Sequence, residues 1–377
     1  MDLVIAKKDL LRLVARCQGV ADKKSAMPVL ANVLLAADGN ALRVSATDLY
    51  LAVSGQTAAE VVSAGSVAVP AKDLLERVKA MPDGPIQVTS REGAQTVIKA
   101  VGSPRRYTLH GMPGGEFPQL PKAAPDAPSL ELPAELLSTL IARTHFSIST
   151  DETRAHVNSA LFEWAGQRVR MVTTDGHRLS KMEATLDGTQ ATATMLIPLK
   201  AIHELRRLAD EAKAEKETPT VHITQSGPNA FFGVAGMTFS VKLVDAQFPP
   251  YQQVIPAGSD KSIRAPRAQL AEALRAVSLA ASDRTGGVKL TITSRALRIT
   301  SESPESGNGF DEVPIDYEGN DVTIGFNAKY FLDVLASVDE DEVTLSVSGE
   351  LDPAVIRPGS DESGPQSYVA VIMPMRI

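Results

Sequence analysis

The residues best suited to acid–base chemistry lie in one short run, Thr173–Arg178, which reads Thr-Thr-Asp-Gly-His-Arg. A carboxylate and an imidazole two residues apart, Asp175 and His177, are a pair that general acid–base catalysis commonly uses. An Asp-Gly step between two apolar runs is, however, first a signal for a tight turn. We therefore interpret the run as a turn, and a hydrolase or transferase built on Asp175 and His177 stays as the enzymatic alternative.

Other catalytic and cofactor-binding patterns are missing from the sequence. No Gly-Lys dipeptide occurs, which excludes a phosphate-binding loop of the P-loop type, and no Gly-x-Gly-x-x-Gly follows a predicted strand. The six histidines show no paired metal spacing, and a single cysteine cannot build a cysteine-ligated zinc site. We expect no catalytic residue, no metal and no cofactor.

The composition is that of a globular protein with substantial cores. The chain has 377 residues, an apolar content of 44% and a net charge of −7, which argues against indiscriminate coating by nucleic acid. The single cysteine, Cys17, fits a reducing compartment. No apolar run is long enough for a membrane span, and the N-terminal run MDLVIAKKDLL lacks the order of a secretory signal, so we expect a cytoplasmic protein.

A long internal repeat organises the chain. Three lysines, Lys72, Lys200 and Lys329, each follow the end of an apolar strand and begin an amphipathic helix. Their spacing is 128 and then 129 residues (72 to 200, 200 to 329). Solenoid units repeat every 20–50 residues or so, and a repeat this much longer is a whole domain.

The repeat predicts the same elements in each copy. A strand runs into a first helix, tight turns join pairs of alternating strands, and the lysine marks a second helix. The first helices are predicted over Lys8–Gln18, Ala134–Thr144 and Arg267–Ala281. With about eight short strands to a copy, the fold class is α+β, with the helices on one face of antiparallel sheet.

Two proline-rich stretches separate the copies and predict extended linkers, because proline cannot donate to a sheet ladder. The predicted domains are therefore residues 1–125, 126–258 and 259–377.

Positive charge recurs on the predicted helices, although the body is acidic. In the first helix the basic residues are four apart and face away from Leu10, Val14 and Cys17. These basic residues are Lys8, Arg12 and Arg16. A charged helix face is usually just solvated, but the lysine recurs at an equivalent place in every copy.

In order along its full length, the chain resembles the bacterial sliding clamp family, the beta subunit of the replicative DNA polymerase. The segments that carry the resemblance are Met27–Leu35, Thr47–Leu49, Val69–Ala71, Phe117–Pro118, Thr174–Leu179, Lys242–Asp245, Phe248–Pro249, Gly325–Asn327 and Tyr368–Ile377. The resemblance implies a processivity factor: a head-to-tail homodimer whose six domains close a ring on duplex DNA. Domain size supports the dimer, because three bodies roughly 30–35 Å across leave almost no hole, whereas six leave about 30 Å.

The resemblance and the repeated basic positions together predict the DNA-facing residues. Phosphate contacts without sequence readout suit a protein that slides. The predicted DNA-binding residues are Lys8, Arg12, Lys24, Lys72, Arg77, Lys79, Lys200, Arg206 and Lys329. The family's aromatic pair near this region is not carried over, because Ala155 and His156 stand there.

The resemblance also implies an apolar cleft between the second and third domains, which takes short linear peptides of the polymerase alpha subunit, the ATP-hydrolysing clamp loader and other polymerases and repair proteins. The predicted cleft residues are Arg154, Val157, Thr174, Gly176, His177, Arg178, Leu179, Pro249, Gln253, Val254, Asn327, Tyr330, Val371, Ile372, Met373, Pro374, Met375 and Arg376. Methionine adapts to many partners, and Pro374 predicts that the last strand is an edge strand. Gln253 replaces a common arginine, which predicts weaker anchoring of an acidic peptide residue.

For the dimer seam, the family pairs an edge strand of the first domain with the third. The predicted interface residues are Arg105, Arg106, Tyr107, Leu109, Leu279, Ala280, Glu305, Asp311 and Glu312. Ala280 is smaller than the apolar residue often found there, which predicts a looser contact. A non-topological nucleic-acid-binding scaffold remains the non-enzymatic alternative to the ring.

Overall fold

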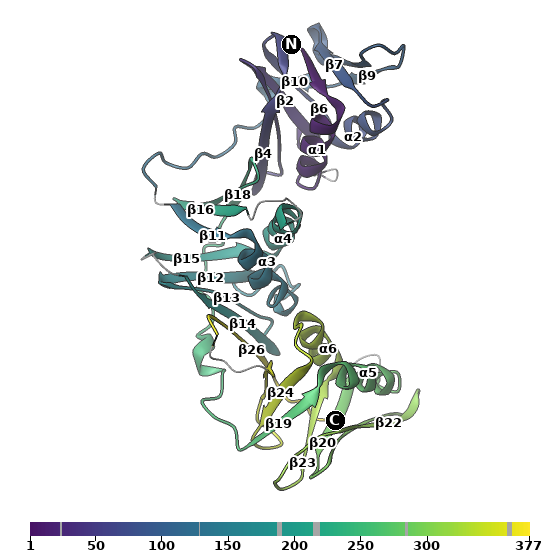
Figure 1. Ribbon diagram of the computed structural model, residues 1–377, viewed down its shortest axis with the longest axis vertical. Helices are drawn as coiled ribbons and strands as arrows, with labels where there is room; N and C mark the ends of the chain where they lie inside the picture. The colour runs from purple at the N-terminus through teal and green to yellow at the C-terminus, as the bar shows by residue number, and fades with distance from the viewer. Residues whose placement is uncertain (23–24, 128, 187–190, 214–218, 283–285, 360–363) are drawn as a thin grey trace. The chain divides into compact units, whose positions relative to one another are not determined.

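The computed structural model describes residues 1–22, 25–127, 129–186, 191–213, 219–282, 286–359 and 364–377 (Figure 1). Lys24 lies outside them. The chain divides into two compact units. Unit 1 comprises Met1–Leu137 and His203–Leu243, and unit 2 comprises Ser138–Ile202 and Val244–Ile377.

Three successive sets of elements follow the sequence repeat, and we name them copies 1, 2 and 3. Copy 1 holds β1 (Asp2–Ala6), α1 (Lys7–Gln18), η1 (Pro28–Ala31), β2 (Asn32–Asp38), β3 (Ala41–Thr47), β4 (Leu51–Ala58), β5 (Glu60–Ser63), β6 (Gly65–Pro70), α2 (Ala71–Lys79), β7 (Pro85–Ser90), η2 (Glu92–Ala94), β8 (Gln95–Ala100), β9 (Arg106–His110), β10 (Met112–Pro113) and η3 (Gly114–Glu116).

Copy 2 is shared between the two units. It holds β11 (Ser129–Pro133), α3 (Ala134–Ala142), η4 (His145–Ser147), β12 (Ser159–Gly166), β13 (Arg168–Thr174), β14 (Arg178–Thr185), β15 (Ala191–Pro198), α4 (Leu199–Lys213), β16 (Thr220–Ser226), β17 (Asn229–Val234) and β18 (Met237–Lys242).

Copy 3 lies in unit 2. It holds β19 (Lys261–Pro266), α5 (Arg267–Ser278), β20 (Gly287–Ile292), β21 (Ala296–Ser303), β22 (Gly307–Pro314), β23 (Val322–Asn327), α6 (Ala328–Ser337), β24 (Glu342–Val347), β25 (Ala354–Pro358) and β26 (Gln366–Ile372). The short helix η5 (Tyr251–Gln253) lies in the linker before it.

Four antiparallel sheets carry the fold. In unit 1, sheet A has the order β5-β1-β7-β8-β9, and sheet B has the order β10-β6-β2-β3-β4-β18-β17-β16-β11. In unit 2, sheet C has the order β15-β12-β13-β14-β26-β25-β24-β19, and sheet D has the order β22-β21-β20-β23. Sheet B thus continues from copy 1 into copy 2, and sheet C continues from copy 2 into copy 3.

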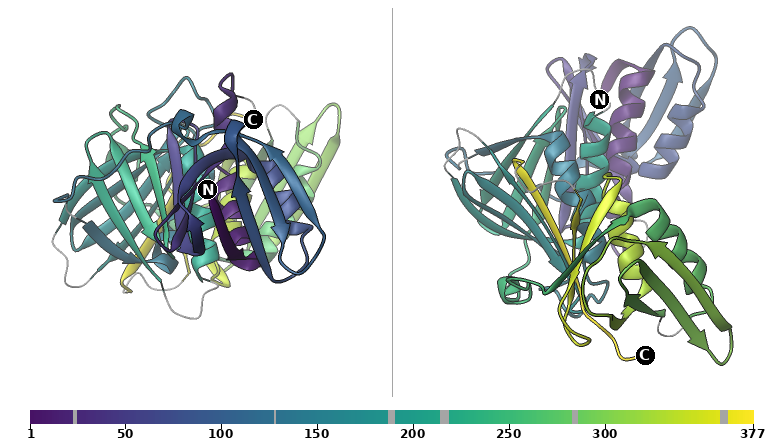
Figure 2. Two further views of the ribbon diagram at one scale, coloured as in Figure 1. Left: turned by 90° about the horizontal axis from the view of Figure 1, so that it is seen from above. Right: turned by 60° about the horizontal axis from the view of Figure 1, so that its bottom comes forward.

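The helices pack on the sheets through one apolar face, as the spacing predicts. In α1, Leu10, Val14 and Cys17 are fully buried, and the helix packs on α2, β3 and β4 (Figure 2). Likewise α5 packs on α6, β21 and β22 (Figure 2). Burial raises the pKa of the Cys17 thiol to about 12, against the opposing effect of the nearby Arg207 and Arg16 guanidinium groups, so the thiol stays protonated and unreactive.

The predicted α+β class, with two helices and antiparallel sheet in every copy, is confirmed. Within the described residues, copy 1 has ten strands and the other two copies have eight each. The helices predicted over Ala134–Thr144 and Arg267–Ala281 end earlier, at Ala142 and Ser278, since the chain continues there as irregular or 3₁₀ turns.

The prediction that Arg16 faces outward with Lys8 and Arg12 is wrong. Arg16 is 8% exposed; its Nε lies 3.0 Å from Glu211 Oε2 and its Nη1 donates to the Ala235 carbonyl at 3.4 Å. The last turn of α1 lies against α4 of the following copy, where Arg207 Nη2 also donates to the Arg16 carbonyl at 2.8 Å. A helix wheel drawn for α1 alone cannot contain that neighbour.

The prediction that the last strand is an edge strand is also wrong. β26 pairs with β14 on one side and β25 on the other. Pro374 falls two residues after the end of β26, so its missing N–H removes no ladder hydrogen bond. The tail continues in extended contacts instead: Met373 N–H donates to the His177 carbonyl at 2.9 Å, and Met375 N–H donates to the Gly325 carbonyl at 2.8 Å.

Candidate functional site

The Asp-Gly run between β13 and β14 forms a hydrogen-bonded turn in unit 2. Thr174 Oγ1 donates to the Arg178 carbonyl at 2.7 Å and accepts from Gly176 N–H at 3.1 Å. Asp175 Oδ1 accepts the N–H groups of His177 at 2.9 Å and Arg178 at 3.0 Å. Gly176 has a φ of 93°, which a residue with a Cβ rarely adopts. The carboxylate that suggested catalysis therefore organises the turn.

Arg178 joins this turn to helix α6. Its Nε lies 3.0 Å from Asp175 Oδ2, and its Nη1 lies 2.6 Å from Asp333 Oδ2. Its guanidinium carbon is 4.4 Å from the centre of the Tyr330 ring, a cation–π distance. Burial raises the pKa of Tyr330, as do the Asp175 and Asp333 carboxylates, while Arg178 lowers it. The Arg178 side chain is thus occupied by contacts within the chain.

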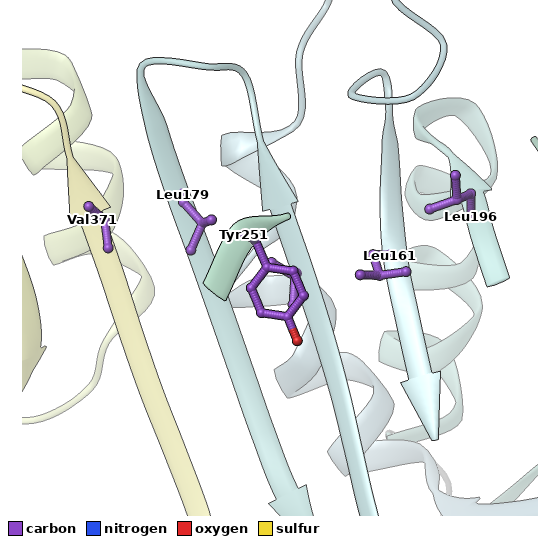
Figure 3. Packing of buried hydrophobic residues seen from close by; sticks show 6 residues of the cluster. Leu161, Leu179, Leu196, Tyr251 and Val371 are labelled. Atoms are coloured by element: carbon purple, nitrogen blue, oxygen red, sulfur yellow. The ribbon is translucent and has the colours of Figure 1, made fainter. Parts of the chain in front are cut away.

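An apolar cluster lies on sheet C beside the turn (Figure 3). Its buried members are Leu161, Val172, Leu179, Leu196, Tyr251 and Val371. In Figure 3 the ring of Tyr251, which belongs to the linker between copies 2 and 3, lies between Leu179 and Leu161, over the strand that separates their strands. The half-buried linker residues Val244, Phe248 and Ile255 pack against the same cluster.

The Tyr251 hydroxyl anchors the linker to the sheet. It accepts a hydrogen bond from Arg170 Nη1 at 3.0 Å and donates to Glu163 Oε2 at 3.0 Å. Arg170 Nε lies 3.1 Å from Glu183 Oε2, which holds the guanidinium between two carboxylates. Burial is the largest influence on the pKa of Tyr251 and raises it, while the Arg170 hydrogen bond opposes the rise.

The predicted cleft residues come together in unit 2, but many are covered. Val254 and Met373 are the most accessible apolar members, at 40% and 38% exposed. Those exposed are Arg154, Gly176, His177, Gln253, Val254, Met373 and Arg376; those half-buried are Pro249, Asn327, Tyr330, Pro374 and Met375; those buried are Val157, Thr174, Arg178, Leu179, Val371 and Ile372. The accessible residues of the predicted cleft thus lie mainly on the tail, the turn and the linker, and the apolar residues of sheet C beneath them are buried.

Leu161, Val172, Leu196 and Tyr251 were missed by the sequence analysis. No sequence signal places a tyrosine of the linker above aliphatic residues of three different strands.

The predicted DNA-binding residues occupy helix surfaces. Lys72, Lys200 and Lys329 are each the second residue of their helix, α2, α4 and α6. Lys72 Nζ lies 3.8 Å from Glu76 Oε1, and Lys329 Nζ lies 2.8 Å from Asp333 Oδ2. Ion pairs of the same kind hold three of the arginines: Arg12 with Asp9, Arg77 with Asp73 and Arg206 with Asp210. Lys8 and Lys79 are exposed.

Most of the predicted seam residues lie on or beside two strands that end their sheets among the described residues, one strand in each unit. Arg106, Tyr107 and Leu109 lie on β9, which ends sheet A, and Asp311 and Glu312 lie on β22, which ends sheet D. Arg105 directly precedes β9, Glu305 precedes β22, and Leu279 at the end of α5 is 83% exposed.

Two of the residues predicted for the seam point inward instead. Leu109 is 2% exposed because alternate residues of β9 face the core, and Ala280 is 7% exposed. Phe310 on β22, which was not among the predicted residues, is 65% exposed beside them; nothing in its strand pattern distinguished it from a residue covered by its own domain.

Within the described part of the chain, no three His, Cys, Asp or Glu side chains gather so as to hold a metal ion. The helices among those residues include none long and apolar enough to cross a membrane.

Comparison with known proteins accounts for nearly the whole chain. Three sequence models of the DNA polymerase III beta subunit match in order: the N-terminal domain at residues 1–121, the central domain at 131–250 and the C-terminal domain at 252–376. The chain is 31% identical over 380 residues to the beta sliding clamp of Pseudomonas aeruginosa and 30% identical over 384 residues to that of Caulobacter vibrioides, with 100% of each chain covered.

Solved structures agree. The crystal structure of the DNA polymerase III subunit beta from Pseudomonas aeruginosa matches with a TM-score of 0.93 at 30% identity, over 100% of both chains. The sliding clamp from Bartonella birtlesii bound to griselimycin matches with a TM-score of 0.91 at 30% identity, again over 100% of both chains. The chain therefore belongs to the DNA polymerase III beta subunit family, the beta sliding clamps.

Proposed function

We propose that two copies of this chain close a ring around duplex DNA and act as the processivity factor of the replicative polymerase. The ring slides without reading sequence, works in the cytoplasm on the nucleoid, and has no catalytic activity of its own. Its domains are residues 1–125, 126–258 and 259–377, three from each chain. Membership of the family supports the role of processivity factor, and the way in which the sheets continue from one copy to the next supports the ring.

The way the sheets continue between copies carries this proposal. The last strand of copy 2, β18, pairs with β4 of copy 1, and the last strand of copy 3, β26, pairs with β14 of copy 2. By the same order, β9 of copy 1 pairs with the strand of copy 3 that matches β4 and β14, which is β22. Both β9 and β22 end their sheets with a free edge among the described residues.

Joining β9 of one chain to β22 of another would pair the backbone N–H and carbonyl groups of both edge strands. Sheet A has five strands and sheet D has four, so the joined sheet has nine, the number in sheet B. Arg105 and Arg106 on one edge face Asp311 and Glu312 on the other, and cross-strand opposite charges stabilise antiparallel pairs. Because each chain carries one edge of each kind, two chains form two seams and the ring closes.

The basic helix positions suit loose contact with phosphate. Lys72 and Lys329, with Arg12, Arg77 and Arg206, each have a carboxylate three or four residues away. Exposed pairs of this kind are worth under about 1 kcal/mol, so a phosphate can displace the carboxylate at little cost. We propose that these residues, with Lys8, Lys24, Lys79 and Lys200, face the duplex.

Short peptides of the polymerase alpha subunit, the clamp loader and repair proteins dock, in this proposal, on the accessible surface around Val254 and Met373. The N–H groups of Met373 and Met375 in the tail are already bonded within the chain, so the peptide binds mainly through apolar side chains that extend the cluster on sheet C. Met373 suits several partners because its side chain is flexible.

Primer extension on a long single-stranded circle tests the function. With the polymerase and loader of the same organism, the chain should lengthen the products of a single binding event at least tenfold. A seam variant, L279D/F310D, should remain folded and lose the effect. If that variant, shown to be monomeric, still lengthens the products, the non-topological scaffold is the better account.

A further inference from the structure

The two junctions between copies within the chain contain the same ion pair. Arg16 lies nine residues after the first residue of α1, and Glu211 lies twelve after the first residue of α4. Arg143 lies nine residues after the first residue of α3, and Glu340 lies twelve after the first residue of α6. Arg16 Nε is 3.0 Å from Glu211 Oε2, and Arg143 Nη2 is 3.2 Å from Glu340 Oε1. Each pair joins the last turn of the first helix of one copy, or the residue after it, to the second helix of the next copy, or the segment after it.

Both pairs are shielded from solvent on the arginine side. The side chains of Arg16 and Arg143 are 10% and 13% exposed. Arg16 also donates to a backbone carbonyl, and the guanidinium of Arg143 lies 5.7 Å from the centre of the Tyr368 ring. Charge-assisted hydrogen bonds in such surroundings are stronger than solvent-exposed ion pairs.

Backbone contacts show independently which residue of copy 1 matches Glu340. Arg267, the first residue of α5, donates its N–H to the carbonyl of Asp341 at 2.8 Å. Lys7, the first residue of α1, donates its N–H to the carbonyl of Gly84 at 3.0 Å. The residue before Gly84 is Asp83, which is also twelve residues after the first residue of α2. By this contact Asp83 of copy 1 matches Glu340 of copy 3. In copy 2 the same contact joins Ala134 N–H to the Pro219 carbonyl at 2.9 Å, and the ion-paired acid, Glu211, lies earlier, within the longer helix α4.

The arginine of the ion pair is not present in copy 3. The residue nine positions after the first residue of α5 is Ala276, which is exposed. The Asp83 carboxylate is fully exposed, and Lys7 Nζ of the same copy lies 3.0 Å from its Oδ1. We infer that the junction between copy 3 of one chain and copy 1 of a second chain repeats the junction within the chain, but without its arginine. This inference rests on the proposed dimer.

The missing arginine leaves the two seams as the weakest junctions of the ring. Edge pairing of β9 with β22 and cover for Leu279 and Phe310 remain, but the helix-to-helix ion pair does not form. Ala276 thus leaves the arginine position of this junction empty, and Ala276→Arg should give Asp83 a second cation besides Lys7. In a single chain an arginine at position 276 would not meet Asp83, so any effect of Ala276→Arg should be seen only in the dimer.

The dissociation constant of the dimer, measured by sedimentation over a dilution series, tests the inference. An exposed ion pair at its strongest is worth about fivefold in a binding constant, and two seams multiply to about 25-fold. A276R should tighten the dimer by that order, and A276R/D83N should lose the gain. Gln269→Arg adds the same charge to an exposed position on the same helix and is the matched control.

The inference is overturned if A276R leaves the dissociation constant unchanged, if Q269R tightens the dimer equally, or if the gain survives D83N. Equal melting temperatures for all variants show that the fold is intact. A wild-type chain that stays monomeric at high concentration contradicts the proposed ring instead.

Discussion

Arg178 and Asp333 lie 2.6 Å apart and join strand β14 of copy 2 to helix α6 of copy 3. The same Asp333 oxygen is 2.8 Å from Lys329 Nζ, so one carboxylate contacts both the turn of the proposed peptide site and a residue of the proposed DNA surface.

Asp333→Asn should destabilise unit 2. Arg178 is 8% exposed, and it would keep Asp175 as its single charged partner, at a cost of about 2 kcal/mol. The midpoint of thermal unfolding should fall by several degrees, while Lys329→Gln, which breaks the exposed contact to the same carboxylate, should shift it very little. Equal shifts in the two variants would mean that the buried contact has no special weight.

Tyr251 should position the linker that borders the peptide site. Tyr251→Phe keeps the ring in the apolar cluster and removes the bonds to Arg170 and Glu163, costing about 1 kcal/mol. Tyr251→Ala leaves a cavity and should cost about 3–5 kcal/mol. Fluorescence polarisation with a labelled polymerase peptide should show weaker binding to the alanine variant than to the phenylalanine variant. Identical affinities for both would exclude this role.

The buried thiol should make stability fall at alkaline pH. Cys17 has an ordinary pKa of 9.0 when unfolded and about 12 in the fold. A raised pKa gives stability that is present below pH 9 and is lost as the pH rises toward 12, because the unfolded thiol ionises first. Between pH 9 and 11, the free energy of unfolding measured with urea should fall more steeply with pH for the wild type than for Cys17→Ala. The difference in slope should be about 1.4 kcal/mol per pH unit. Parallel slopes would contradict the burial of this thiol.

The three repeated lysines should account for part of the salt dependence of DNA binding. Each phosphate contact contributes about 0.9 to the slope of log K against log salt. The triple variant K72A/K200A/K329A should therefore lower the slope on a short duplex by about 2–3. A control that removes three other lysines, K99A/K122A/K289A, should leave the slope unchanged. A loss of slope that is the same for both would show only a net-charge effect.

Local features of this chain could be predicted from its sequence. The Asp175–Gly176 turn was predicted correctly, because its hydrogen bonds are made by residues close together in sequence. The recurring lysine was placed near the start of each second helix, because strand, helix start and apolar spacing are all local. Two helices and antiparallel sheet in every copy follow from the same patterns.

Contacts between copies could not be predicted. Arg16 and Glu211 are 195 residues apart in sequence, and Arg143 and Glu340 are 197 apart. A basic residue on a helix looks solvated until the element that covers it is known. The burial of Tyr251 by a linker and the exposure of Phe310 on a free edge depend likewise on what packs, or does not pack, beside them.

Topological retention on DNA tests the central claim most directly. The chain is loaded on nicked circular DNA, part of the sample is then linearised, and both forms are challenged with high salt before gel filtration. A closed ring stays on the circle with a half-life of many minutes and slides off the free ends at once, since salt weakens phosphate contacts without opening the ring. Loss from circular and linear DNA at the same rate would contradict the ring.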